Sequence, residues 1–173
     1  MSGQNRTIEI YTDGAASPNP GPGGYAVILV DNGTRTELSG GFRMTTNNRM
    51  ELLAVISGLR AAADTGRPIA VYSDSRYVVD MINGGYAQRW RANGWMRDRR
   101  QHAENPDLWG DLLDLCARLD VEFTWIRGHD EHVENERCDE LAVAARQLDN
   151  LPRDSTYEKA IEIAPTQGEF EWK

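Results

Sequence analysis

The chain has 173 residues and a net charge of −8, and 40% of its residues are hydrophobic and 27% charged, which is ordinary for one soluble domain with a substantial core. It has no apolar run of the ~20 residues needed to cross a bilayer, and two cysteines are too few for a disulfide framework. These features exclude a membrane protein and a disulfide-stabilised secreted domain, so we expect a cytoplasmic monomer that contacts no membrane.

Three strands are predicted first. Apolar and polar residues alternate over 8–12, and this strand ends at Asp13, where a turn rich in Gly and Pro begins. Residues 25–30 and 34–42 form two more strands, and the Asn-Gly pair between them is a strong hairpin signal. Short links predict an antiparallel meander. Because the glycines at 21–24 precede a strand and not a helix, we reject a dinucleotide-binding loop.

Helices and strands alternate through the rest of the chain. The order predicts an α/β fold with a five-stranded mixed sheet, in which parallel additions follow three antiparallel strands and helices flank the sheet. We expect one domain over 1–149 and a dispensable, loosely ordered acidic extension over 150–173, although the alternating run 160–163 could instead dock and bury its two isoleucines. The predicted elements are helix 52–63, strand 69–73, helix 75–82, helix 106–119, strand 121–126 and helix 133–148.

Four acids are candidates for a site. Asp13 and Asp74 each end a predicted strand, and parallel neighbours would bring both to one edge of the sheet, where α/β folds place their sites. Glu51 lies in the first turn of a buried helix, where Asn48-x-x-Glu51 also fits a capping box. Asp139 is one of several acids on the last helix, and by itself it indicates only a solvent-exposed face.

Five short segments around these acids form one ordered pattern. They are Tyr-Thr-Asp-Gly at 11–14, Asn-Pro-Gly-Pro-Gly-Gly-Tyr at 19–25, Thr-Thr-Asn-Asn-Arg-Met-Glu-Leu at 45–52, Ser-Asp-Ser at 73–75, and Gly-His-x-x-His-x-Glu-Asn-Glu-Arg-Cys-Asp-Glu-Leu-Ala at 128–142. In order and spacing the pattern resembles type 1 ribonuclease H, over residues 6–148. The resemblance implies a ribonuclease H-like fold and hydrolysis of the RNA strand of RNA–DNA hybrids, leaving 5′-phosphate and 3′-hydroxyl ends.

The same resemblance implies a metal site. Asp13, Glu51, Asp74 and Asp139 would bind two Mg²⁺ ions, with Mn²⁺ as a substitute; Asp13 would be shared, and Asp139 would complete the ion that activates water. Mg²⁺ prefers hard carboxylate oxygens, and clustered carboxylates without a cation would repel one another. His129 would transfer protons or assist product release. A zinc site from His129, His132 and Cys138 is the alternative, but it lacks the closed four-ligand pattern.

Substrate contacts follow from the resemblance as well. The segment 86–102 resembles the family's basic protrusion; its simpler interpretation is a solvated charged helix with its tryptophans in the core. The acidity of the chain does not exclude this role, because 130–173 holds 12 acids and 5 bases against 15 and 14 in 1–129, and screening keeps fields local. The expected substrate-binding residues are Asn19, Asn47 and Asn48 in the groove, Thr46, Ser75 and Arg89 at a DNA-strand phosphate, and Trp90, Trp95, Arg97, Arg99 and Arg100 in the protrusion.

Two departures from the family pattern and two rival functions remain. Arg76 stands where many relatives carry an uncharged residue, and 15–17 lacks the cysteine of the usual turn. A proofreading-type exonuclease would carry Asp-x-Glu on the first strand, whereas Gly14-Ala15 follows Asp13. A non-catalytic hybrid-binding module would have lost its metal ligands, whereas all four acids are present. Metal-dependent turnover would separate an enzyme from such a module.

Overall fold

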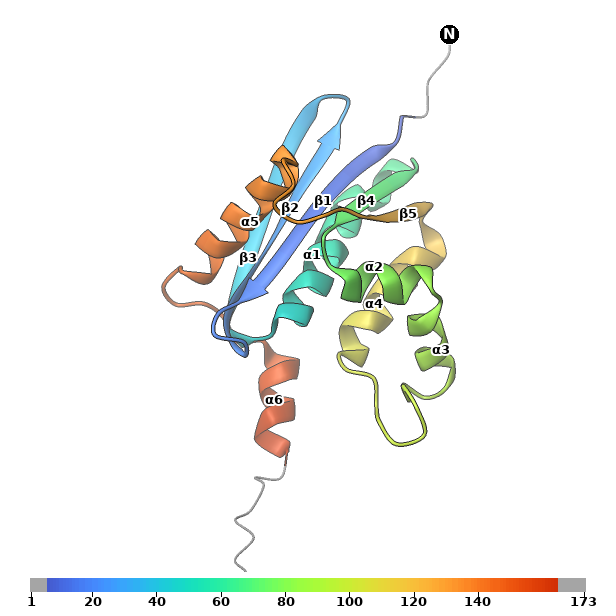
Figure 1. Ribbon diagram of the computed structural model, residues 1–173, viewed down its shortest axis with the longest axis vertical. Coiled ribbons are helices and arrows are strands. Elements are labelled where there is room, and N and C mark those ends of the chain that lie inside the picture. Colours follow the sequence, from blue (N-terminus) through green and yellow to red (C-terminus); the bar gives the residue numbers. More distant parts are fainter. Residues whose placement is uncertain (1–5, 165–173) are drawn as a thin grey trace, which may run out of the picture.

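The computed structural model describes residues 6–164 and contains one five-stranded sheet in the order β3-β2-β1-β4-β5. β1 pairs antiparallel with β2 and parallel with β4, so the predicted mixed sheet is confirmed (Figure 1). None of the helices in the described part is both long and apolar enough to span a membrane. The elements are β1 (Ile8–Ala16), β2 (Gly21–Asp31), β3 (Thr34–Thr45), α1 (Asn47–Ala62), η1 (Ala63–Thr65), β4 (Ile69–Ser73), α2 (Arg76–Asn83), α3 (Tyr86–Ala92), α4 (Pro106–Arg118), β5 (Val121–Trp125), α5 (Val133–Arg146) and α6 (Ser155–Ile163).

The first two strands are longer than predicted. β1 continues past Asp13, which pairs with Ala26 of β2, and the turn is confined to residues 17–20. The glycines interpreted as turn residues have another use, because a Cβ on Gly24 would lie 2.1 Å from the Ala142 carbonyl oxygen of α5. Gly24 therefore lets a helix approach the sheet. The prediction that the first strand ends at Asp13 was wrong, because β1 continues to pair with β2 as far as Ala16.

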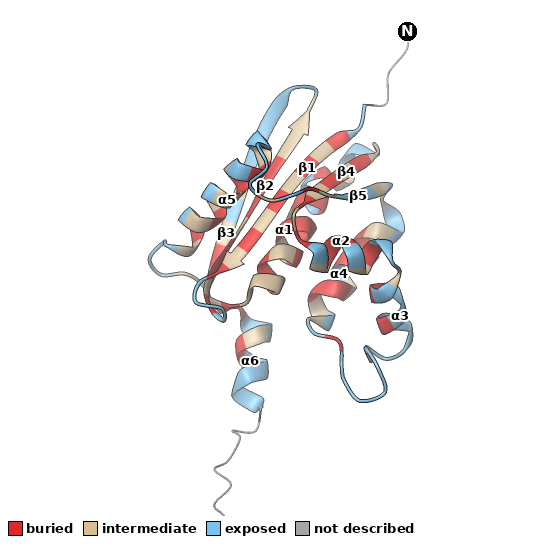
Figure 2. Cartoon of the chain, in the orientation of Figure 1, coloured by how far each residue is buried: buried red, intermediate tan, exposed pale blue. Residues whose placement is uncertain are grey.

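Helices cover both faces of the sheet (Figure 1). The buried side chains of Ile8, Ile10 and Val27 belong to the core that includes α1 and α4, whereas Ala26 and Ile28 pack against α5. Strand residues alternate between faces, so Asp13 shares the α5 face with Tyr11, and Gly14 shares the α1 face with Ile10. In Figure 2, buried and half-buried residues alternate along β1.

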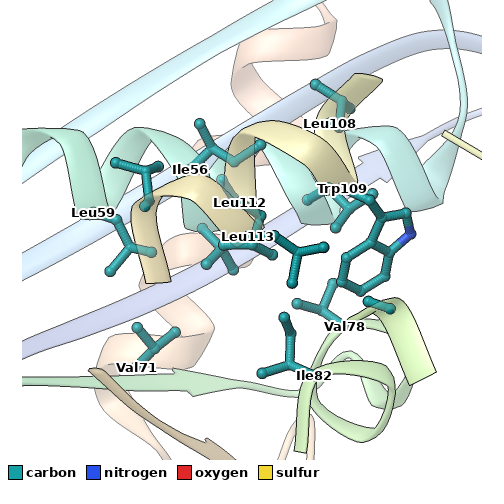
Figure 3. Close-up of a cluster of buried hydrophobic side chains, with 14 of the residues drawn as sticks. Ile56, Leu59, Val71, Val78, Ile82, Leu108, Trp109, Leu112 and Leu113 are labelled. Atoms are coloured by element: carbon teal, nitrogen blue, oxygen red, sulfur yellow. The ribbon is translucent and has the colours of Figure 1, made fainter. Parts of the chain in front are cut away.

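The largest apolar cluster joins α1, α2 and α4 (Figure 3). Ile56 and Leu59 of α1 face Leu112 and Leu113 of α4, and all four side chains are buried. Full burial of one such side chain contributes roughly 1.5–3 kcal/mol to folding before entropy costs. This cluster fixes α1 against the sheet, and α1 carries Glu51.

Residues 150–164 of the predicted acidic extension lie within the described part of the chain. α6 forms there, and its N-cap Asp154 is 6% exposed. Ile161 and Ile163 are 47% and 70% exposed, so the alternative in which both isoleucines are buried is wrong. Polar contacts hold this segment instead. Residues 165–173 of the predicted extension lie outside the described residues.

Candidate active site

Asp13 lies where β1 loses its parallel neighbour. The β1–β4 pairing ends with Thr12 opposite Ser73, so Asp13 and Asp74 each follow the last residue paired between these strands. The register of β1 and β4 therefore brings Asp13 and Asp74 to the same edge of the sheet, as expected. A Cβ on Gly14 would lie 2.3 Å from the Met50 carbonyl carbon and 2.5 Å from the Glu51 nitrogen, so β1 touches α1 at Glu51.

The acids act on one another electrostatically. Burial raises the pKa of Asp13 to about 8, and the negative charges of Asp74, Asp139 and Glu51 add to this rise, against the opposing effect of the Gly14 N–H bond. Burial also raises the pKa of Asp74, to which Asp139 adds. A carboxyl group feels such effects only from close neighbours. The four predicted acids therefore form one electrostatic cluster, to which β1, α1, α5 and the end of β4 contribute.

Glu51 is held by a serine and does not cap its helix. α1 begins at Asn47, and the side chain of its N-cap, Thr46, accepts a hydrogen bond from the Arg49 N–H. The capping-box interpretation of Asn48 and Glu51 was wrong, because Glu51 lies beyond the first turn. Instead the Ser75 hydroxyl donates to Glu51 Oε2 at 2.5 Å. Burial raises the pKa of Glu51 to about 7, although this hydrogen bond opposes the shift.

Asn135 stands within the motif at 128–142, but the sequence alone assigned it no role in the site. It is 3% exposed on α5, four residues before Asp139. Its side chain hydrogen-bonds Asp74, which lowers the pKa of that carboxyl against the effect of burial. Its Oδ1 has no partner among the described residues. The sequence did offer a signal for Asn135. It is a polar residue on the buried face of an otherwise acidic helix, and it lies one turn before the candidate ligand Asp139.

The donor set suits a hard divalent cation. In the described part of the chain, no three His, Cys, Asp or Glu side chains are grouped so that they could hold an ion as they stand. The fit lies in the chemistry, because buried carboxylates that raise one another's pKa are neutralised by a cation. Carboxylate oxygens are the protein ligands that Mg²⁺ prefers.

His129 and Cys138 differ in character. His129 is exposed in the loop before α5 with φ of 58°, and it acts to lower the pKa of Asp74. It therefore lies close enough to the acids to influence one of them. Cys138 is buried, its thiol donates to the Tyr11 carbonyl oxygen at 3.3 Å, and burial raises its pKa to about 12. The structural interpretation of Cys138 suits this environment.

The predicted groove asparagines belong to one hydrogen-bonded corner. The Asn47 side-chain oxygen accepts from the Ala16 N–H at 2.6 Å, and the Asn19 side-chain oxygen accepts from the Asn47 N–H at 3.2 Å. This ties the β1–β2 turn to the start of α1. Asn48 follows as the second residue of α1. Ser75, expected at a phosphate, is 4% exposed and also caps α2 through the Val78 N–H, so its hydroxyl is already engaged.

The segment 86–102 separates into buried and exposed side chains. Trp90 is 8% exposed and packs edge-on against Trp109, with ring centroids 5.9 Å apart. Trp95 is partly buried against the same core. Burial of Trp90 leaves it little surface for a substrate, as the packing interpretation anticipated. Arg89, Arg97, Arg99 and Arg100 are exposed; Arg89 stacks on Tyr86, Arg97 contacts Asp98 and Gln101, and Arg99 and Arg100 form no ion pair with described residues.

Arg76, the departure from the family pattern, lies on an aromatic ring. Its guanidinium carbon is 3.9 Å from the centroid of Trp125, and the Trp125 indole N–H donates to the Asp74 carbonyl oxygen at 3.0 Å. Arg76 also approaches Asp80 at 3.8 Å. Cation–π stacking on Trp125 therefore holds the charged guanidinium of Arg76, which lies two residues after Asp74 in the chain.

Comparison with known proteins agrees with this geometry. The family model for RNase H matches residues 5–147. The ribonuclease H of Trichodesmium erythraeum is 54% identical over 158 residues, which are 91% of this chain and 100% of that protein. Ribonuclease HI of a Synechocystis strain is 50% identical over 148 residues, which are 85% of this chain and 92% of that one.

Solved structures give the same result. LC9-RNase H1, described as a type 1 RNase H with the type 2 active-site motif, is 31% identical with a TM-score of 0.70, covering 81% of this chain and 72% of that one. LC11-RNase H1 in complex with RNA/DNA hybrid is 26% identical with a TM-score of 0.62, covering 80% and 96%. With its sheet order, its clustered acids and these relatives, the chain belongs to the ribonuclease H family of enzymes, as a type 1 member.

Proposed function

We propose that this enzyme hydrolyses the RNA strand of RNA–DNA hybrids in a reaction that depends on Mg²⁺, with Mn²⁺ as a substitute. The clustering of the four acids carries the metal dependence, because burial first, and then the charges of Asp74, Asp139 and Glu51, raise the pKa of Asp13 to about 8. Acids that repel one another in a partly buried site require a cation to stay ionised at neutral pH. The hybrid bound to LC11-RNase H1 supports this class of substrate.

Asp13, Glu51, Asp74 and Asp139 would hold two Mg²⁺ ions, with Asp13 shared between them. When bound, paired ions lower the pKa of water and stabilise the attacking and leaving oxygens of an in-line displacement. The water oxygen bonds to phosphorus, the bond from phosphorus to the 3′-oxygen breaks, and a proton reaches that oxygen. The products carry 5′-phosphate and 3′-hydroxyl ends.

Other residues orient these carboxylates and move protons. The hydrogen bond from Ser75 orients Glu51, and that from Asn135 orients Asp74. His129 is exposed in a loop near Asp74, so it can exchange a proton with the leaving oxygen or assist product release. Orientation before the ions bind lowers the reorganisation that the reaction requires.

The groove corner and the protrusion would bind the duplex. The Asn47 N–H at the start of α1 donates to the Asn19 side chain in the β1–β2 turn, and Asn47 lies four residues before Glu51 on the same helix. Amide side chains can detect the 2′-hydroxyl that distinguishes RNA from DNA. Arg99 and Arg100 are exposed and unpaired within the described residues, so they can contact phosphates and supply sequence-independent affinity.

The test is cleavage of an end-labelled RNA–DNA hybrid, beside RNA duplex, DNA duplex and single-stranded RNA. We expect only the RNA strand of the hybrid to be cut, with Mg²⁺ or Mn²⁺ and not with EDTA. Ligation at the new 5′ ends and polymerase extension from the new 3′ ends check the end chemistry. Asp13→Asn, prepared in parallel, controls for a contaminating nuclease.

Three results would contradict the proposal. Equal cleavage of RNA duplex and hybrid would contradict the substrate class. Full activity in EDTA would contradict the proposed dependence on metal ions. Tight binding of the hybrid with no cleavage under any divalent metal would indicate a non-catalytic binding module.

A further inference from the structure

A cluster of charges surrounds the buried Arg49 at the start of α1, outside the carboxylate site. Arg49 is 4% exposed, and its guanidinium donates to both oxygens of Asp107 at 3.0 and 2.8 Å. It also donates to both oxygens of Asp154 at 2.7 and 3.1 Å, and Asn105 accepts a further bond at 3.3 Å. Every nitrogen of the guanidinium has a partner, which is the condition for burying a charge.

Asp154 accepts two hydrogen bonds besides those from Arg49. The Thr45 hydroxyl donates to its Oδ2 at 2.8 Å, and its Oδ1 accepts from the Tyr157 N–H at the start of α6. The two oxygens of one carboxylate therefore link the end of β3, the first turn of α1 and the first turn of α6. Thr45 is fully buried, so this link is shielded from water.

Further contacts secure the segment that carries Asp154. The Arg43 N–H donates to the Pro152 carbonyl oxygen at 2.9 Å, and the Arg43 guanidinium donates to both oxygens of Glu158 at 2.9 and 2.8 Å. Arg153 pairs with the same carboxylate at 3.0 Å. Residues 152–158 are thus held by charge and hydrogen bonds along the end of β3, where α6 leaves the body of the protein in Figure 1.

These anchors meet the stretch 45–51, which carries much of the candidate site. Thr45 and Arg49 bracket Asn47 and Asn48, and Glu51 comes two residues after Arg49. The Asn47 side chain accepts from Ala16 on the other side of the helix start. The direction of the first turn of α1 is therefore set by the β1–β2 turn and by Asp154.

We infer that Asp154 is a positioning residue of the active site: through Arg49 and Thr45 it fixes the first turn of α1, and with it the groove amides and Glu51. Asp154 bonds none of the four acids, so it acts only through its partners. Without its charge, Arg49 keeps one carboxylate instead of two, and a buried cation that loses a partner moves toward water. The inference rests on the proposed function.

The test uses the full chain and Asp154→Asn, which keeps shape and N-cap chemistry but removes the charge. The readouts are the Kd for an RNA–DNA hybrid in EDTA, from fluorescence anisotropy, and KM and kcat with Mg²⁺. Electrostatics alone predicts that losing one negative charge leaves hybrid binding unchanged or tightens it. A positioning role predicts instead that hybrid binding becomes weaker.

The matched control is Glu162→Gln, which removes the same charge from an exposed position of α6. Val71→Ala, a buried change in β4, shows how a loss of stability alone affects the kinetics. All variants are measured at a temperature at which circular dichroism shows them folded. Thr45→Val, which removes only the hydroxyl bond to Asp154, is judged by the same criterion if Asp154→Asn does not fold.

We expect Asp154→Asn to weaken hybrid binding and raise KM by at least ~5-fold, since a shift of ~1 Å in a positioning group can cost on the order of 100-fold. Glu162→Gln and Val71→Ala should stay within ~2-fold of wild type, which is within the range of screened surface and stability effects. Binding by Asp154→Asn that equals or exceeds that of Glu162→Gln would overturn the inference. If the wild-type chain itself failed to cut hybrids, the proposed function would fail instead.

Discussion

Glu51 and Asp74 show how residues outside the carboxylate set determine where the acids lie. Ser75 donates to Glu51, and Asn135 bonds Asp74 from α5. Each bond favours the ionised form of a carboxylate whose burial favours the neutral form. The site is therefore poised between proton binding and cation binding, and single substitutions should separate the two.

Asp13→Asn should abolish cleavage while hybrid binding without metal persists. The reason is the central position of Asp13, whose pKa responds to Asp74, Asp139 and Glu51, so that losing its charge would remove the ligand that we propose is shared between two ions. Cleavage assays with Mg²⁺ and anisotropy in EDTA measure the two properties. Near-normal activity dependent on Mg²⁺ would remove Asp13 from the site.

His129→Ala should slow turnover without destroying the site. His129 is exposed and lies in a loop, and the metal ions would already supply the activated water, so we expect kcat to fall by about 100-fold or less. Burst and steady-state rates on a short hybrid distinguish proton transfer from product release. A collapse of substrate affinity with unchanged kcat would make His129 a binding residue instead.

At the scale of elements, the protrusion combines a buried anchor with exposed cations. Trp90 packs on Trp109, and the loop that follows is closed by the bridge between Met96 and His102. The Asp98 side chain accepts from the Arg100 and Gln101 N–H groups at 2.8 and 2.9 Å, which turns the loop and lowers the pKa of that carboxyl. The arginines therefore lie on a loop whose conformation these hydrogen bonds fix.

Replacing Arg97, Arg99 and Arg100 together with Gln should weaken hybrid binding and flatten its salt dependence. Removing one phosphate contact lowers the slope of log K against log salt by about 0.9 for B-form duplex. Arg97 already contacts Asp98 and Gln101, so most of the change should come from the other two. Arg35→Gln, in the β2–β3 hairpin at the opposite end of Figure 1, is the control. An unchanged slope would mean that the loop never meets the duplex.

Truncation after residue 149 should lower stability, contrary to the expectation of a dispensable extension. It would leave Arg49 buried with Asp107 and without Asp154. Removing one partner of a buried ion pair costs about 3–5 kcal/mol, and less is expected here because Asp107 remains. With about 2–4 °C per kcal/mol in a chain of this size, the melting temperature should fall by roughly 5–10 °C. A fall of less than ~2 °C would mean that the segment contributes little to folding.

At the scale of the whole molecule, the acid cluster couples stability to pH and to metal. Asp13 and Glu51 have pKa values raised to about 8 and about 7, with burial the largest cause. A carboxyl whose pKa is raised on folding stabilises the fold fully below its unfolded value, near 4. That contribution is lost as pH rises through the folded pKa.

The melting temperature of the metal-free protein should therefore fall between pH 5 and pH 9. One unit of net pKa shift corresponds to about 1.4 kcal/mol, so a fall of several degrees is expected. Mg²⁺ should raise the melting temperature more at pH 8 than at pH 5, because it binds the ionised acids. Asp13→Asn should flatten the pH profile in EDTA; a profile that stays as steep would locate the coupling elsewhere.

The sequence by itself determined the mixed sheet and the family to which the chain belongs. Alternating strands, the Asn-Gly hairpin and the alternation of helix and strand are local patterns, and local patterns carry this information. The four acids were found because they fall within motifs of the family, and Asp13 and Asp74 also because each follows a strand. Glycines misled the interpretation at β2, since a close approach of a helix and a turn both call for Gly.

Only the tertiary structure decided which contacts hold the site together. Asn135 lies 61 residues from Asp74, and Asp154 lies 105 residues from Arg49, so neither pair leaves a trace in any local window. The docking of residues 150–164 was also hidden, because hydrophobic patterning detects buried apolar faces and this segment is held by ion pairs. Ionic contacts depend on where two distant side chains end in space, which sequence periodicity does not encode.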